Sequence, residues 1–176
     1  MWFFHVTGAL QGTRDHADER SVFRPTFEPT SPRAKGLKLH VSNESLELDR
    51  TVEFIRENCA PDERIFVICG DQVIYFLSER DSILPKENYF TYLSNFKFID
   101  SESDARLTDA QIVQELIARP PRFVIQKRND RKTDDFFTTW PRTASHIGRA
   151  YSRAVEFGQF QVLELRGSRP AGKELE

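Results

Sequence analysis

Cysteine and methionine are scarce in this chain, with two Cys and one Met among 176 residues. Cys59 and Cys69 stand ten residues apart without a paired histidine motif nearby, which does not fit a zinc site. A disulfide between them is not expected, because an intervening strand would separate them by roughly 15 Å at about 3.3 Å per residue. We therefore expect no metal, no disulfide and no cofactor of the chain's own.

Excess basic charge and long apolar runs are also missing. Lys and Arg number 25 against 27 Asp and Glu, a formal net charge of -2, whereas nucleic-acid-binding proteins usually carry a basic excess on one face. No run approaches the roughly 20 apolar residues of a membrane-spanning helix. The opening 1–10, MWFFHVTGAL, lacks the basic start of a signal peptide. We expect no nucleic-acid partner and a chain that is soluble when taken alone.

What the sequence does contain is the composition of a globular domain with an aromatic-rich interior. Hydrophobic residues make up 39%, charged residues 30%, and there are 15 Phe. A chain of this length holds one domain with a hydrophobic core. Residues 11–36 are polar and proline-containing, so we predict an N-terminal arm or linker over 1–36, the domain over 37–166 and a tail over 167–176.

The first half of the domain has the pattern of a helix followed by a buried strand. Apolar residues alternate over 37–41, which predicts a short edge strand. Apolar positions recur at helical spacing from Leu46 to Cys59, and Pro61 follows. The continuous apolar run from Ile65 to Cys69 is typical of a strand that is buried on both faces.

The second half repeats this order. Thr108 and Gln111 form a capping-box pattern that opens a helix. Two prolines end it, and Arg122 to Gln126 is a second apolar run. The recurrence favours a parallel sheet in which these two strands are central neighbours.

The C-terminal part completes the predicted architecture. Short helices are expected over Asp134 to Trp140 and Ser145 to Ala150, and Tyr151 to Leu165 is expected to form a hairpin that turns near Gly158. The sequence therefore predicts an α/β fold. In detail, we expect a single three-layer sandwich with a mostly parallel central sheet and a C-terminal β-hairpin.

Gly70 and Asp71 follow the first buried strand, where ligands gather in α/β sheets. A dinucleotide fingerprint needs three glycines and a nucleophile elbow needs a serine, and this turn has neither. We favour a tight turn at Gly70 and a helix cap at Asp71, with Tyr75 packed into the core. The alternative is a stand-alone enzyme, with Asp71 as acid or base and Arg80 as anion clamp. Arg80 either pairs with a neighbouring carboxylate or points into a cleft.

The segment Lys127 to Asp135, KRNDRKTDD, mixes bases with acids and is interpreted as a solvated loop. Its alternative role is contact with a glycan or an anionic lipid headgroup. A different alternative is a protein-interaction module that uses an exposed aromatic patch over Tyr89 to Phe98. The four histidines are scattered along the chain, so no Ser-His-Asp or Cys-His set is assembled from them.

Three segments carry a resemblance to a known family. They are Phe54 to Asn58 with Pro61 and Asp62, Ile74 to Ser78 with Arg80, and Pro120 to Val124. In this order and approximate spacing, over 37–166, they resemble the soluble C-terminal domain of polyprenyl-phosphate-dependent membrane glycosyltransferases. That group contains dolichyl-phosphate-mannose–protein mannosyltransferases and aminoarabinose transferases. Glu79 stands where a glycine is usual in the family.

The resemblance implies a location, a partner and a division of labour. The catalytic carboxylate of such enzymes lies in a membrane part that precedes this domain, and the opening 1–5 fits the end of a last membrane helix. The chain is therefore expected to be a non-catalytic accessory domain on the extracytoplasmic face, periplasmic or cell-surface, of a transferase that uses a polyprenyl-phosphate sugar. Its partner would be the membrane part of the parent transferase. The binding residues that we single out are Asp71, Tyr75, Arg80, Lys127, Arg128 and Arg131.

Overall fold

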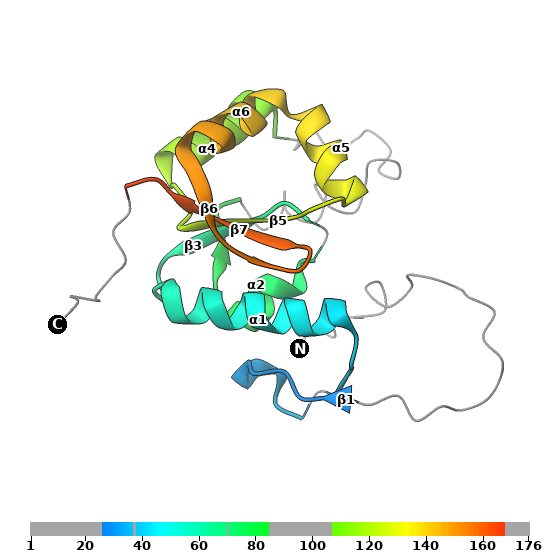
Figure 1. Cartoon of the computed structure of the whole chain (residues 1–176). Helices are drawn as coiled ribbons and strands as arrows, with labels where there is room; N and C mark the ends of the chain where they lie inside the picture. The colour runs from blue at the N-terminus through cyan, green and yellow to red at the C-terminus, as the bar shows by residue number, and fades with distance from the viewer. Residues whose placement is uncertain (1–25, 37, 70, 85–106, 168–176) are drawn as a thin grey trace, which may run out of the picture.

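The computed structural model describes residues 26–36, 38–69, 71–84 and 107–167, and these form an α/β fold around an open five-stranded sheet. Helices lie on both sides of this sheet, with α1 and α2 on one side and α4, α5 and α6 on the other (Figure 1). The helices are α1 (Asn43–Asn58), α2 (Val73–Ser78), α4 (Asp109–Ala118), α5 (Arg131–Thr139) and α6 (Pro141–Ala150), with a 3-10 turn η1 (Pro32–Ala34). The strands are β1 (Thr26–Phe27), β2 (Leu39–His40), β3 (Arg64–Val67), β4 (Asp81–Ser82), β5 (Phe123–Lys127), β6 (Tyr151–Phe157) and β7 (Phe160–Leu165).

The sheet is mixed, in the order β4-β3-β5-β7-β6. Strands β4, β3 and β5 run parallel, whereas β7 is antiparallel to both β5 and β6. The prediction that the two apolar runs are parallel, inner neighbours is confirmed, because Ile65 pairs with Phe123 and Val67 with Ile125. The C-terminal hairpin is confirmed as well. Gly158 turns it with a φ of 56°, and a Cβ at this position would overlap the Glu47 carboxylate.

Helix α1 begins at Asn43, three residues before the predicted start at Leu46. Its N-cap Ser42 accepts a bond from the Ser45 N–H, while the Ser45 hydroxyl accepts one from the Ser42 N–H. This reciprocal capping adds a first turn that apolar periodicity does not show. Val52 and Ile55 are then buried on the side that faces the interior.

Two apolar clusters fill the two sides of the sheet, and β3 together with Ile68, the residue after it, contributes to both. Ile65 and Val67 join the cluster that contains Ile55 of α1, whereas Phe66 and Ile68 join the cluster that includes residues of α4, α5 and α6. Side chains along a strand alternate between its faces. Both faces are covered, which explains why this strand is a continuous apolar run.

The charged segment Lys127 to Asp135 is not a loop, and this prediction is wrong. Lys127 is the last residue of β5, and α5 already begins at Arg131. The Asp130 carboxylate accepts the Thr133 N–H at 2.9 Å and caps the helix there. A short charged stretch thus holds a strand end, a turn and a helix start, and Asp130 satisfies an N–H of the first helical turn.

Helix α6 also starts earlier than predicted. It begins at Pro141 rather than at Ser145. Proline suits the first helical position, where its missing N–H is not needed.

Residues 26–36 pack against α1 and α2 rather than standing apart (Figure 1). Ala34 is buried together with Val52 and Leu77, and the Ser31 hydroxyl donates to the Leu77 carbonyl at 2.6 Å. Strands β1 and β2 form a separate two-stranded antiparallel sheet. Across the described ranges, none of the helices combines the length and the apolar character needed to cross a membrane.

Candidate functional site

The carboxyl ends of β3 and β5 meet at a small ion cluster centred on Lys127. The Lys127 Nζ atom lies 2.6 Å from Glu44 Oε1 and 2.6 Å from Asp71 Oδ2, and its side chain is only 10% exposed. The same Nζ lies 4.7 Å from the centroid of the Phe160 ring. Glu44 comes from the first turn of α1 and Asp71 from the turn after β3. The cluster therefore ties three elements together at the place where α/β sheets usually bind ligands.

The charge state of Lys127 follows from these two carboxylates. Burial by itself would lower the pKa of Lys127, but the hydrogen bonds and charges of Asp71 and Glu44 raise it overall. The ammonium thus stays protonated at neutral pH and does not serve as a base. Nearby, burial and the Asp71 charge raise the pKa of the Cys69 thiol far above its ordinary value, so this sulfur stays protonated.

Asp71 does not cap α2, and the prediction that it would is wrong. The N-cap residue of α2 is Gln72, which makes no side-chain cap bond, and the Asp71 carboxylate binds Lys127 instead. Only the Asp71 backbone takes part in the turn, where its carbonyl accepts the Ile74 N–H at 3.0 Å. An N-cap bond would join the carboxylate to a neutral N–H, whereas the bond to Lys127 joins two opposite charges and satisfies a nearly buried ammonium, which explains why the ion pair takes the carboxylate.

Tyr75 fills a gap in the sheet. The Val67 N–H donates to Tyr75 Oη at 2.7 Å. Strand β4 pairs only with Arg64 and Ile65, so Val67 lies beyond its end. The phenol thus replaces a missing strand partner, while its ring packs against the cluster on the α1 side.

Arg80 is 8% exposed, and among the described residues its guanidinium binds backbone carbonyls rather than the carboxylate of Glu79 or Asp81. Its guanidinium donates to the Cys59 carbonyl through Nε at 3.1 Å and through Nη2, and to the carbonyls of Arg56 at 3.3 Å and Ser78 at 3.0 Å. These carbonyls include the unpaired ones at the C-terminus of α1, where the helix dipole favours a cation. The arginine therefore fixes α2 to the end of α1.

Asp71 and Arg80 are not brought together. Asp81 pairs with Arg64 at the start of β3, which places the preceding Arg80 near the amino end of that strand. Asp71 follows its carboxyl end. The proposed acid or base and the proposed anion clamp are therefore separated by the length of β3.

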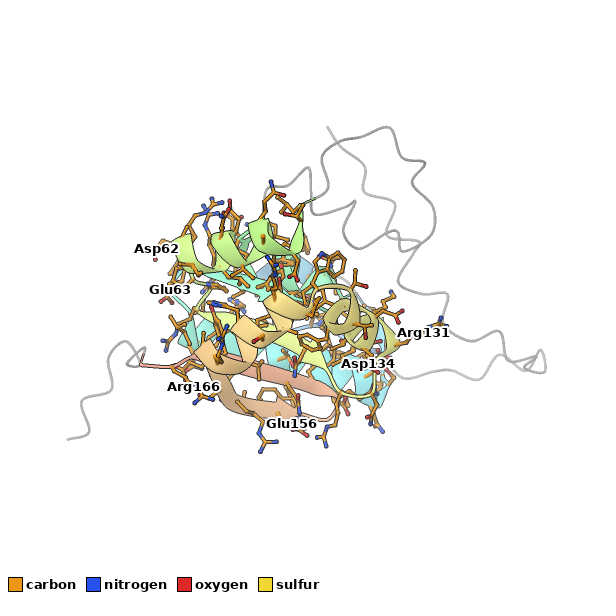
Figure 2. All side chains as sticks on the ribbon, turned by 90° about the horizontal axis from the view of Figure 1, so that it is seen from above. Asp62, Glu63, Arg131, Asp134, Glu156 and Arg166 are labelled. Atoms are coloured by element: carbon orange, nitrogen blue, oxygen red, sulfur yellow. The ribbon has the colours of Figure 1, made fainter. Side chains whose placement is uncertain are left out.

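The remaining predicted binding residues lie on the surface beside the ion cluster. The Arg128 guanidinium forms an ion pair with Glu156. Arg131 is 88% exposed and its Nε lies 3.7 Å from Asp135 Oδ2. Figure 2 shows Arg131 pointing away from the body of the molecule. Of the three basic residues singled out as binding residues in this segment, Arg131 is the most exposed and Lys127 is almost enclosed.

A pocket that the sequence analysis did not predict lies at the opposite end of the sheet. It has a volume of about 240 Å³ and is lined by Asp62, Glu63, Arg64, Arg119, Pro120, Arg122 and Leu165. Figure 2 shows Asp62 and Glu63 across the molecule from Arg131 and Asp134. The sequence did carry a signal for it, since an arginine stands directly before each of the two buried apolar runs.

Neither possible metal ligands nor comparisons with known proteins identify a further site. Over the ranges that the structure describes, no group of three or more His, Cys, Asp or Glu side chains is placed to hold a metal ion. No protein-family model, curated protein or solved structure matches the chain.

Proposed function

We propose that this chain is the non-catalytic extracytoplasmic domain of a membrane glycosyltransferase that uses a lipid-linked sugar, and that it assists placement of the acceptor or the donor over the membrane part. The observation that carries this proposal is the position of Arg80. It belongs to the second of the three segments behind the family resemblance, and it binds the carbonyls of Arg56 and Cys59 at the end of the first.

The third segment joins the same structural unit. The Arg122 N–H donates to the Arg64 carbonyl at 2.8 Å, and the Tyr151 hydroxyl donates to the Pro121 carbonyl at 3.1 Å. The residues shared with the family thus hold helices and strands together rather than forming a reaction centre. Such a role fits a domain whose chemistry is supplied by another part of the protein.

Glu79 gives independent support to the resemblance. Its φ of 59° lies in the left-handed region, directly after the last residue of α2. This conformation favours glycine at a helix C-terminus. Glycine is the residue that the family usually has at this position, so the conformation of Glu79 supports the resemblance.

We also propose a more detailed description of the fold. A three-layer sandwich with a mostly parallel central sheet is supported by the helices on both sides of the sheet and by the parallel strands β4, β3 and β5.

The stand-alone enzyme is the weaker alternative, because Asp71 is engaged with Lys127 and Arg80 with helix carbonyls at the other end of β3. The aromatic segment Tyr89 to Phe98, on which an interaction module would depend, lies outside the described residues.

Fractionation of cells that make the native protein tests the proposal. An antibody raised against this chain should detect a polypeptide in the membrane fraction that detergent extracts but high salt and alkali do not. External protease should remove the epitope from intact cells or spheroplasts. A native polypeptide of about 20.5 kDa that stays in the soluble fraction would contradict the proposal.

A further inference from the structure

Two arginines stand side by side at the amino end of the parallel strands. Arg64 opens β3, and Arg122 directly precedes β5. Their backbones are hydrogen-bonded, with the Arg122 N–H on the Arg64 carbonyl at 2.8 Å. Both side chains line the pocket of about 240 Å³, together with Arg119. Like charges at adjacent positions of a sheet are unfavourable unless an opposite charge lies between them.

The two guanidinium groups differ in how far they are neutralised. Arg122 is 8% exposed and its Nη2 lies 2.7 Å from Glu164 Oε1. Arg64 is half-buried, forms no ion pair with any described residue, and makes one long hydrogen bond, from Nη1 to the Ser82 carbonyl at 3.4 Å. A guanidinium has five N–H donors and is always charged. Arg64 therefore offers the pocket charged donors that no described residue of the chain uses.

The acidic residues of the pocket limit the charge that it can accept. Asp62 and Glu63 line it as well. The Glu63 carboxylate is turned toward its own turn, where it accepts the Ala60 N–H at 2.7 Å, and Arg119 pairs with Glu115. Glu164 and Glu115 pair with two of the three arginines, so Arg64 is the one lining arginine without a carboxylate partner among the described residues. One unpaired guanidinium beside two carboxylates can balance a single negative charge but not a polyanion.

We propose that this pocket binds a singly charged oxyanion, a carboxylate or a phosphodiester, carried by a small polar ligand, with Arg64 as the main donor. The planar guanidinium matches the two oxygens of such a group. An oxyanion beside Arg64 and Arg122 would also relieve their mutual repulsion. The site stands on this geometry alone and does not depend on the proposed function.

Titration of the 176-residue chain followed by NMR tests the site. Glucuronate is the carboxylate probe, dimethyl phosphate is the phosphodiester probe, and glucose is the neutral counterpart, all at constant ionic strength. At least one of the two anions should saturably shift the Arg64 Nε–H resonance and the backbone amide resonances of the other pocket residues, which also report on the variants, and glucose should not. Arg64→Gln should weaken that binding by about tenfold or more, as expected for the loss of a charged hydrogen-bond donor. The anion that binds shows whether the ligand of this pocket carries a carboxylate or a phosphodiester.

Matched variants separate a built site from general surface charge. Arg131→Gln removes an exposed arginine at the other end of the molecule and should leave binding unchanged. Arg119→Gln, also at an exposed position of the pocket, should weaken binding even if Arg64→Gln fails to fold. The absence of saturation by either anion, or equal losses in the Arg131 and pocket variants, would overturn the proposal.

Discussion

Among the described residues, three nearly buried cations are stabilised by three different sets of partners. Lys127 has two carboxylates and Arg122 has one, whereas the partners described for Arg80 are backbone carbonyls and the Cys59 thiol. A buried charge is costly unless it is paired and hydrogen-bonded. Removal of a partner from any of these side chains should therefore lower the free energy of unfolding.

Replacement of Lys127 tests the ion cluster directly. Lys127→Met keeps the apolar stem but leaves Asp71 and Glu44 facing each other without the ammonium, and it should lower the free energy of unfolding by about 1 to 3 kcal/mol. Arg131→Met removes an exposed ion pair and should cost less than about 0.5 kcal/mol. Urea unfolding monitored by circular dichroism gives both values. Equal losses in the two variants would show that the cluster adds nothing to stability.

Phe66 tests the core on the side of α4, α5 and α6. Its side chain is 1% exposed and its ring centroid lies 6.0 Å from that of Phe136. Phe66→Ala should cost about 3 to 5 kcal/mol, because it removes buried surface and leaves a cavity. Phe76, at 52% exposure, offers the matched control, since Phe76→Ala removes the same ring from the surface. A Phe66→Ala cost below about 1 kcal/mol would contradict this packing.

At the scale of elements, helix α6 is capped by a residue of another helix. Its own N-cap residue, Trp140, makes no side-chain cap bond. Asp109 of α4 supplies the acceptors, with Oδ2 taking the Arg142 N–H at 2.8 Å and Oδ1 taking the Thr143 N–H at 2.9 Å. One carboxylate thus completes the start of α6 and fixes it beside the start of α4.

The Asp109 carboxylate predicts a pH-dependent contribution to stability. Burial by itself would raise the pKa of Asp109, but the hydrogen bonds from Thr143 and Arg142 lower it below its ordinary value. A lowered pKa in the folded state means that the stabilisation is present above the unfolded pKa, about 3.9, and is lost as the pH falls through the folded value.

Asp109→Ala should cost about 1 kcal/mol at pH 7, and Asp109→Asn should cost less because the amide keeps one of the two acceptor oxygens. The difference in unfolding free energy between wild type and Asp109→Asn should shrink between pH 5 and pH 2. Urea titrations at several pH values measure it, with the exposed helical Glu53→Ala as control. A difference that is constant over this range would rule out the ionised cap.

At the scale of the whole molecule, the two ends of the parallel strands differ in kind. The carboxyl end is closed by the ion cluster of Lys127, whereas the amino end holds the arginine pocket. This reverses the usual expectation for open α/β sheets, where the carboxyl end receives the ligand. By position, the sequence makes the turn after Gly70 the candidate site, although a structural role is favoured for it there.

We expect the isolated chain to be inactive in a sugar-transfer assay. If the catalytic carboxylate belongs to a membrane part, the 176 residues alone should not release or transfer sugar from a labelled polyprenyl-phosphate donor. Product formation is measured against a heat-treated sample, and membranes that contain a complete transferase serve as positive control. Reproducible turnover by this chain would contradict the proposed function and favour the enzyme alternative.

The sequence by itself determined the two buried strands, the capping box at Thr108 and the hairpin, because these depend on local pattern. Apolar runs, cap spacing and a turn glycine act over a few residues and can be recognised there. The sequence also brought Asp71 and Lys127 into one set of candidates, though not as partners.

Only the tertiary structure decided which charges meet. Asp71 binds Lys127 instead of capping its own helix, Arg80 reaches the carbonyls of α1, and Asp109 caps a helix that starts more than thirty residues later. The physical reason is that a polar side chain takes the strongest partner within reach, and that partner is set by how distant segments are brought together. Local sequence spacing indicates which polar side chains are candidates for a cap or an ion pair. The packing of the helices on the sheet determines which of the possible partners each side chain contacts.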